Sequence, residues 1–256
     1  MKRIIANIIL FFITTFFFVG CVSKYISYKE TETTSYYPIF IAKYSISLWR
    51  VESPEKSSER YGIQKVDTIS QKSEYNYSFE DDNIKILWIA TSRNISFYLQ
   101  NKTDHSIKIP WDEAAYVDEN GFSHRVMHSG IKYIDKDKTM PPTVIVRKGF
   151  IKDIVFPTDY VYYDEGNRSY ISDPSSWEKK VLLLDYRSQY GESNVSQEDY
   201  SRDDSLAFEK FNKEVKLNIG KNYQVLLPLQ IKDEINEYIF IFNFDDVTTK
   251  QDSLSY

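Results

Sequence analysis

The 256-residue chain contains a single cysteine, Cys21. One cysteine cannot form an intramolecular disulfide, and it cannot supply the several thiolates of a structural zinc site. The stability of the folded chain must therefore come from its hydrophobic core. The chain is long enough for one large domain or two small ones, and we expect one.

The sequence also lacks the short motifs that mark several common classes of enzyme. It contains no glycine-rich phosphate loop, no Gly-x-Ser-x-Gly nucleophile elbow and no His-Glu-x-x-His helix. No repeat of fixed period is visible either. We therefore expect a protein that is not an enzyme and that holds no cofactor and no metal ion.

A concentration of positive charge is missing as well. The chain has 32 basic and 37 acidic residues, which gives a formal net charge of −5. Acids and bases are interspersed, as at residues 52–56 and 135–138, so no continuous basic surface is expected. Binding to nucleic acid depends on such a surface, because basic side chains neutralise the phosphates. We therefore expect no nucleic-acid partner.

The first 21 residues have the organisation of an export signal. Lys2 and Arg3 precede an apolar run at 4–19, and this order is typical of a secretory signal peptide. The run ends in the motif Phe-Val-Gly-Cys at 18–21. This ending resembles the lipobox of bacterial lipoproteins, with phenylalanine at the position where the family usually has leucine.

The resemblance implies that residues 1–20 are a lipoprotein signal peptide, and that Cys21 is lipidated and anchors the protein to a membrane of the bacterial cell envelope. Residues 21–36 would then be a lipidated tether. Two or more acyl chains on Cys21 would suffice for stable anchoring. The anchored protein would face the periplasm or the cell surface. Val22 stands where enterobacterial inner-membrane lipoproteins have aspartate, which favours the outer membrane. The same apolar run also fits an uncleaved transmembrane helix or an ordinary secreted protein.

The remainder of the chain has the composition of a β protein. Tyrosine, phenylalanine, isoleucine and valine are abundant, and aromatic residues make up 16% of the chain. Residues 94–100 alternate between apolar and polar side chains, as a half-buried strand does. A similar alternation at 107–111 predicts a hairpin partner for this strand across a turn at 101–104.

Two further hairpins are indicated by turn and strand signals. The sequence Asp-Glu-Asn-Gly at 118–121 suits the positive backbone angles of a tight turn, and it should join strands at 114–117 and 122–127. Alternating apolar residues at 225–231 and an apolar run at 238–244 predict a central hairpin. Other strand-like segments lie at 38–51, 60–69, 83–90, 143–147 and 151–156.

About ten short strands separated by turns are typical of two packed antiparallel sheets. We therefore predict a mainly β fold, an immunoglobulin-like antiparallel β-sandwich that forms a single domain at 37–247. A C-terminal tail should follow at 248–256. The polar chain at 164–205 should form long surface loops, and one short helix is expected at 205–213.

Several motifs in the middle of the chain resemble uncharacterised bacterial envelope lipoproteins that have a domain of this type. The motifs are Phe97, Asn101-Lys-Thr, Trp111-Asp-Glu, Asp118-Glu-Asn-Gly and Pro157-Thr-Asp. This resemblance supports the location and the fold. It carries no catalytic motif, so it implies no activity.

Histidines and nearby acids are the first candidates for a chemical site. His124 and His128 lie four positions apart in a predicted strand and therefore share a face. In an extended strand they would be about 13 Å apart, so a turn is needed before they could meet Asp112 or Glu113 around one metal ion. The alternative, which we prefer, is that the histidines pack at the rim of the core.

Aromatic residues give a second candidate site. Tyrosine and tryptophan set among serine, asparagine and glycine are typical of adaptable recognition loops. The residues in question are Tyr160, Tyr162, Tyr163, Tyr170 and Trp177. The alternative is that these rings cover a broad sandwich.

These observations favour a non-enzymatic, membrane-anchored binding module whose partner is an envelope protein or a glycan. One alternative is an envelope hydrolase or metal-binding protein that uses the two histidines and two acids named above. Another is a structural accessory subunit of an envelope complex, which needs no pocket. A deep pocket where the four side chains converge would favour the first alternative.

Overall fold

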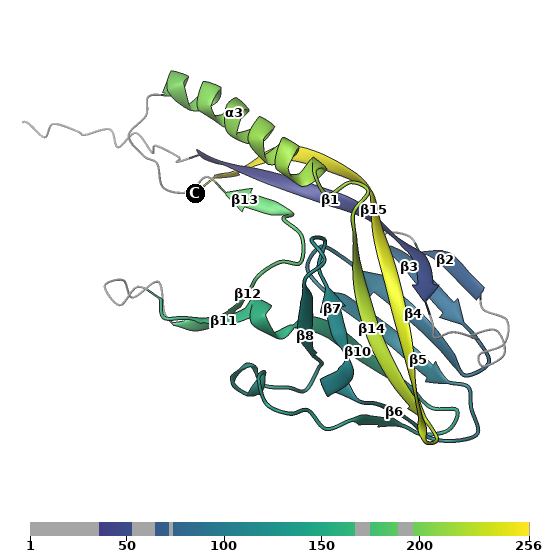
Figure 1. Cartoon of the computed structure of the whole chain (residues 1–256). Coiled ribbons are helices and arrows are strands. Elements are labelled where there is room, and N and C mark those ends of the chain that lie inside the picture. The colour runs from purple at the N-terminus through teal and green to yellow at the C-terminus, as the bar shows by residue number, and fades with distance from the viewer. Residues whose placement is uncertain (1–35, 53–64, 72–73, 167–174, 189–196, 256) are drawn as a thin grey trace, which may run out of the picture. The chain divides into compact units, whose positions relative to one another are not determined.

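Two long antiparallel strands, β1 (Tyr36–Glu52) and β15 (Glu234–Ser255), pair along the full length of β1. The first part of β15 also forms a hairpin with β14 (Asn222–Ile231). Lys232 begins the two-residue turn between them with a φ of 57°, the left-handed conformation that tight hairpin turns require. These three strands form the framework on which the rest of the sheet is built (Figure 1).

The computed structural model describes residues 36–52, 65–71, 74–166, 175–188 and 197–255. The expected signal peptide at 1–20, the lipidated Cys21 and the candidate residue Tyr170 lie outside this part of the chain. Of the expected tether at 21–36, only Tyr36 is described.

Thirteen strands form one antiparallel sheet, in the order β13-β1-β15-β14-β7-β8-β10-β5-β4-β3-β2, with β6 joined to β14 and β9 to β6. The strands not yet given are β2 (Lys65–Gln71), β3 (Glu74–Glu80), β4 (Ile84–Ala90), β5 (Ile95–Asn101), β6 (Ile107–Ile109), β7 (Ala115–Val117), β8 (Ser123–Met127), β9 (Thr143–Ile145), β10 (Phe150–Pro157) and β13 (Tyr186–Ser188). A separate two-stranded sheet consists of β11 (Val161–Asp164) and β12 (Ser176–Lys179). Short 3-10 turns lie at η1 (Trp111–Glu113), η2 (Tyr133–Asp135) and η3 (Thr158–Tyr160).

The sheet curls over a core that is rich in aromatic rings. Trp88 on β4 lies 4.8 Å from Phe240 on β15 and 5.1 Å from Phe97 on β5, measured between ring centroids. Phe79 on β3 contacts Phe240 and Tyr238 of β15 in the same way. All of these rings are fully buried. They therefore hold the β3–β4–β5 part of the sheet against the part formed by β14 and β15.

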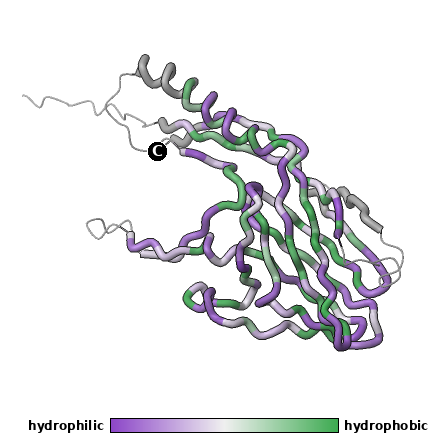
Figure 2. Tube along the Cα trace, viewed as in Figure 1, coloured by the Kyte–Doolittle hydropathy of each residue, from purple (hydrophilic) through white to green (hydrophobic). Residues whose placement is uncertain are grey.

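The one α-helix of the described residues, α3 (Gln197–Lys216), packs on the outer parts of β1 and β15 (Figure 1). A second, smaller hydrophobic cluster lies beneath it. The buried members are Phe40, Ala42, Phe211, Val215 and Val247. Along the strands, hydrophobic residues alternate with hydrophilic ones (Figure 2), as expected where one face of a sheet is buried.

The structure confirms a mainly β chain with an antiparallel sheet. Strand β5 has the predicted alternation, with Ile95, Phe97 and Leu99 buried on one face. The hairpin of β7 and β8 is joined at the predicted turn, where Gly121 has a φ of 87°. The predicted hairpin near the C-terminus is present as β14 and β15.

The predicted hairpin between 94–100 and 107–111 is wrong. Strand β5 pairs with β4 and β10, whereas β6 pairs with β14 and β9. The cause lies in the turn, because the Asn101 side-chain amide donates hydrogen bonds to the carbonyl oxygens of His105 and Ile145. These bonds direct the chain away from β5 and into another part of the sheet.

Several element boundaries also differ from those predicted. The helix is longer than the expected 205–213, and residues 248–255 continue β15 and pair with β1 instead of forming a tail. Strand β3 was not predicted, because its serine, asparagine and glutamate resemble a loop sequence. Within the predicted surface loops at 164–205 the structure contains β12 and β13 as well as the start of α3.

Candidate functional site

An open cleft of about 790 Å³ lies between β1 and the turn that joins β4 to β5. Its size falls in the range of about 300–1,000 Å³ that is common for ligand sites. The lining consists of residues 41–46 of β1, Tyr77, residues 89–93, Asp185, Asp246 and Thr248. The lining therefore combines apolar side chains of β1 and β4 with polar and charged side chains.

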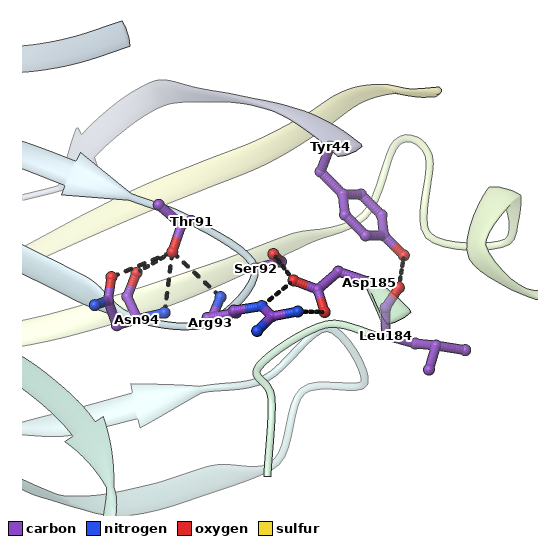
Figure 3. Close-up of polar contacts among 7 residues, drawn as sticks. All are labelled: Tyr44, Thr91, Ser92, Arg93, Asn94, Leu184 and Asp185. Carbon is purple, nitrogen blue, oxygen red and sulfur yellow. Dashed lines mark hydrogen bonds and ion pairs between the residues drawn. The ribbon is translucent and has the colours of Figure 1, made fainter. Parts of the chain in front are cut away.

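The turn from Thr91 to Asn94 is fixed by its own side chains (Figure 3). The Thr91 hydroxyl oxygen accepts hydrogen bonds from the backbone N–H groups of Asn94, at 3.0 Å, and of Arg93, at 3.2 Å. Threonine favours such local turns because its hydroxyl can replace a backbone acceptor. The turn thus holds Ser92 and Arg93 in the wall of the cleft.

A salt bridge between Arg93 and Asp185, two residues of this lining, is shown in Figure 3. Arg93 Nε donates to Asp185 Oδ2 at 2.7 Å, and Nη2 donates to Oδ1 at 3.2 Å. The Ser92 hydroxyl donates to the same Oδ2 at 2.6 Å. These hydrogen bonds to Asp185 raise the pKa of the Arg93 guanidinium. This two-point geometry is the one in which arginine binds carboxylates most strongly.

The two partners of this salt bridge differ in their exposure to solvent. The Asp185 side chain is only 8% exposed, whereas the Arg93 side chain is 62% exposed. Arg93 Nη1 forms no hydrogen bond with any described residue. One edge of the guanidinium is therefore held by the protein, and the other edge is available to a ligand.

The wall of the cleft around Asp185 is joined to both neighbouring strands. The Asp185 carbonyl accepts a hydrogen bond from the Ala42 N–H of β1 at 2.8 Å, and the Leu183 N–H donates to the Ser92 carbonyl at 2.9 Å. The Tyr44 hydroxyl donates to the Leu184 carbonyl at 3.1 Å (Figure 3). These bonds hold the segment at 182–185 between β1 and the β4–β5 turn.

The four side chains of the predicted histidine site do not converge. His124 Nδ1 lies 2.8 Å from Asp159 Oδ2, and its Nε2 lies 3.4 Å from Asp118 Oδ2. The Asp112 carboxylate instead accepts a hydrogen bond from Arg125, and the Glu113 side chain is exposed. In the described part of the chain, no group of three or more His, Cys, Asp or Glu side chains is placed to hold a metal ion.

His128 has a separate environment. Its ring stacks on Trp111, with centroids 4.4 Å apart and planes 7° apart, and Nδ1 lies 3.4 Å from Asp153 Oδ2. Burial raises the pKa of the Asp153 carboxyl, but hydrogen bonds from His128, Ser129 and the Ile154 N–H outweigh this effect and leave the pKa below its usual value. The His128 ring is therefore packed on Trp111 beside the Asp153 carboxylate.

The structure divides the predicted aromatic site. Tyr163 and Trp177 lie opposite each other on β11 and β12, with ring centroids 5.4 Å apart. Tyr160 instead packs against His124, and burial raises the pKa of its hydroxyl to about 12. The Tyr162 side chain is 43% exposed and precedes Tyr163 in the strand, so it points to the opposite face.

Sequence reasoning missed the residues of the cleft. Arg93 and Asp185 are far apart in the chain, and neither belongs to a recognisable motif. Two weak signals were present: the polar turn Thr-Ser-Arg-Asn at 91–94 between two strands, and an aspartate directly after the apolar residues at 181–184.

Comparison with family models, curated proteins and solved structures gave no match to this chain. Its function must therefore be inferred from its own residues. In the part of the chain that the structure describes, no helix has both the length and the hydrophobicity needed to cross a bilayer.

Proposed function

We propose that this protein is a lipid-anchored, non-enzymatic binding module of the bacterial cell envelope, and that its ligand occupies the cleft beside Arg93. The observation that carries the proposal is the Arg93 guanidinium in the lining of the cleft: the buried Asp185 holds one edge of it, and the other edge is available to a ligand. Ser92 and Arg93 both donate hydrogen bonds to Asp185. These bonds hold the guanidinium in one orientation, as a binding site requires.

The cleft suggests the chemistry of the ligand. Ile46 and Ile89 supply apolar surface, and Arg93 Nη1 supplies a charged donor. Apolar contact together with a few placed polar groups is the usual composition of a binding site. The ligand should therefore combine an apolar part with a carboxylate. The aromatic pair of Tyr163 and Trp177 remains a proposed second contact surface.

The cleft can be tested with 4-phenylbutyrate, a small probe that has both parts. Added to the full-length protein in lipid nanodiscs, it should shift the NMR signal of the Arg93 Nε–H, which Asp185 holds in place. Arg93→Lys keeps a positive charge near Asp185 but removes the planar donor pair, so we expect binding about tenfold weaker, or about 1.4 kcal/mol. Arg147→Lys, at an exposed arginine outside the cleft, should bind as the unmodified protein does. Equal affinities for all three proteins would contradict the proposed site.

The lipid anchor is supported by the lipobox-like sequence at 18–21. The intact mass of the protein from its native membrane fraction should show cleavage before Cys21 and the addition of acyl chains. Cys21→Ser should lose the acyl mass and leave the membrane fraction, because a thioether-linked anchor needs the thiol. An unacylated mass that still includes residues 1–20 would replace the lipid anchor with a transmembrane one.

We further propose that the curled sheet is a variant of the immunoglobulin-like sandwich. The packing of Trp88 and Phe79 against Phe240 of β15 supports this, because it places two parts of one sheet face to face. An experimental structure in which the β3–β4–β5 part of the sheet does not pack face to face on the part formed by β14 and β15 would contradict the relationship.

A further inference from the structure

One edge of β1 has few strand partners. On one side β1 pairs with β15 along its whole length, whereas on the other side β13 pairs only with Ile39–Ile41. Beyond that point no described strand pairs with this outer edge of β1. Residues 41–46 of β1 line the cleft, so the unpaired edge borders the proposed binding site.

The hydrogen-bond partners of Ala42 and Ile46 show to which side of β1 the backbone groups of Tyr44 point. The Ala42 N–H bonds to the Asp185 carbonyl, and the Ile46 carbonyl accepts a hydrogen bond from the Tyr77 hydroxyl, both on the outer side of β1. Backbone groups of alternate residues in a strand point to the same side. The N–H and C=O of Tyr44, between these two residues, therefore point outward as well.

The β-bulge in this region does not change that direction. The pairing of β1 with β15 shifts between Ser45 and Ile46, where Ile46 pairs with Phe244. The N–H and C=O of Phe244 bond to Lys221 and Gly220, away from β1. Phe244 therefore offers no backbone bond to Ile46, and the backbone groups of Ile46 face outward like those of Tyr44.

We propose that the ligand of the cleft is an extended peptide segment, which adds a short strand to the outer edge of β1 at Tyr44 and Ile46. The inference rests on the proposed function and specifies the partner of the same site. Addition of a strand to an open sheet edge is a common mode of peptide recognition, in which backbone hydrogen bonds give affinity and alternate side chains give specificity. An open edge that is not occupied is otherwise a risk for aggregation.

The lining of the cleft restricts the sequence of this peptide. Lys43 and Arg93 carry positive charge, Asp185 and Asp246 carry negative charge, and this balance disfavours strongly charged peptides. Ile46, Ile89 and Ala90 offer apolar surface to every second side chain of the peptide. The partner segment should therefore be apolar at alternate positions and carry one acidic side chain for Arg93.

The first experiment measures amide hydrogen exchange in the full-length protein in nanodiscs, residue by residue. The amides of Lys43 and Ser45 face β15 and should exchange slowly with or without ligand, whereas the Tyr44 amide should exchange quickly in the free protein. A six-residue peptide of alternating valine and threonine with one glutamate should slow exchange at Tyr44 at least tenfold. Slow exchange at Tyr44 before any peptide is added would overturn the proposal, since it would mean that the edge is already covered.

A matched pair of modified peptides separates backbone pairing from simple apolar contact. In one peptide alternate backbone amides are N-methylated, and in the other the intervening amides are methylated. Only one set can face β1, so one isomer should bind like the unmodified peptide and the other at least tenfold more weakly. Replacing the glutamate by glutamine should weaken binding to the unmodified protein more than it weakens binding to Arg93→Lys, in which a cation remains but the planar donor pair is lost. Equal affinity of the two isomers would refute strand addition.

Binding of 4-phenylbutyrate without binding of the peptide would reject the peptide and retain the cleft, and failure of both probes would reject both proposals.

Discussion

Replacing Trp88 by alanine is expected to lower the free energy of unfolding by about 3–5 kcal/mol, the usual cost of removing a large buried aromatic side chain. Trp88 is fully buried, and its ring contacts Phe97, Phe240 and Phe242 at centroid distances of 5.1, 4.8 and 5.6 Å. The substitution therefore removes contacts between β4 and β5 on one side of the core and β15 on the other. Urea denaturation followed by circular dichroism measures the loss.

Two control variants separate packing from other effects of the substitution. Trp49→Ala, at a side chain that is 57% exposed, should change the stability by no more than about 0.5 kcal/mol. Trp88→Phe should cost much less than Trp88→Ala, because the buried Trp88 Nε1 has no hydrogen-bond partner among the described residues and none is lost with it. If Trp88→Ala were as stable as Trp49→Ala, the curled arrangement of the sheet would be incorrect.

The second large effect is expected at Asp81, a carboxylate that is 1% exposed. Asp81 Oδ1 accepts hydrogen bonds from the N–H groups of Asn83 and Ile84, and Oδ2 accepts one from the Tyr238 hydroxyl at 2.8 Å. Asp81→Ala removes the acceptor of all three donors, and a buried donor without its acceptor costs about 1–3 kcal/mol. We therefore expect a loss of about 2–3 kcal/mol in urea denaturation at neutral pH.

Asp81→Asn keeps an acceptor and tests the effect of pH. Burial raises the pKa of the Asp81 carboxyl in the folded protein, although hydrogen bonds from Ile84, Tyr238 and Asn83 lower it in part. An acid with a raised pKa contributes stability that is fully present below its unfolded pKa and is lost as the pH rises through the folded pKa. Asparagine has no such titration. The stability of the variant relative to the unmodified protein should therefore increase between about pH 4 and pH 7. A constant difference over this range would contradict the raised pKa.

The local parts of the fold could be predicted from the sequence because their signals are short. The turn that ends at Gly121 and the alternating side chains of β14 each determine a hairpin within a few residues. The pairing of β6 could not be predicted in this way, because it depends on hydrogen bonds of Asn101 to residues more than 40 positions away. Periodicity shows that a segment is a strand and gives no information about its neighbour.

The candidate site was beyond prediction for the same reason. Arg93 and Asp185 are separated by 92 positions, and Tyr44 and Leu184 by 140. Each of these residues is common in surface turns and strands, and only the folded sheet brings them together. The histidine site was proposed because His124 and His128 share a face of a predicted strand, but a shared face does not make side chains converge.

The small cluster beneath α3 has a consequence for the dynamics of the protein. Among the described residues, its buried side chains are separate from the main core, so the helix is held by only a part of the total free energy of unfolding. Such a unit can open locally while the rest of the protein stays folded. Asn218, just after α3, donates a hydrogen bond to the Tyr44 hydroxyl, which itself bonds to the wall of the cleft at Leu184. Detachment of α3 would therefore loosen that wall, and by thermodynamic linkage a ligand that fills the cleft would hold the helix in place.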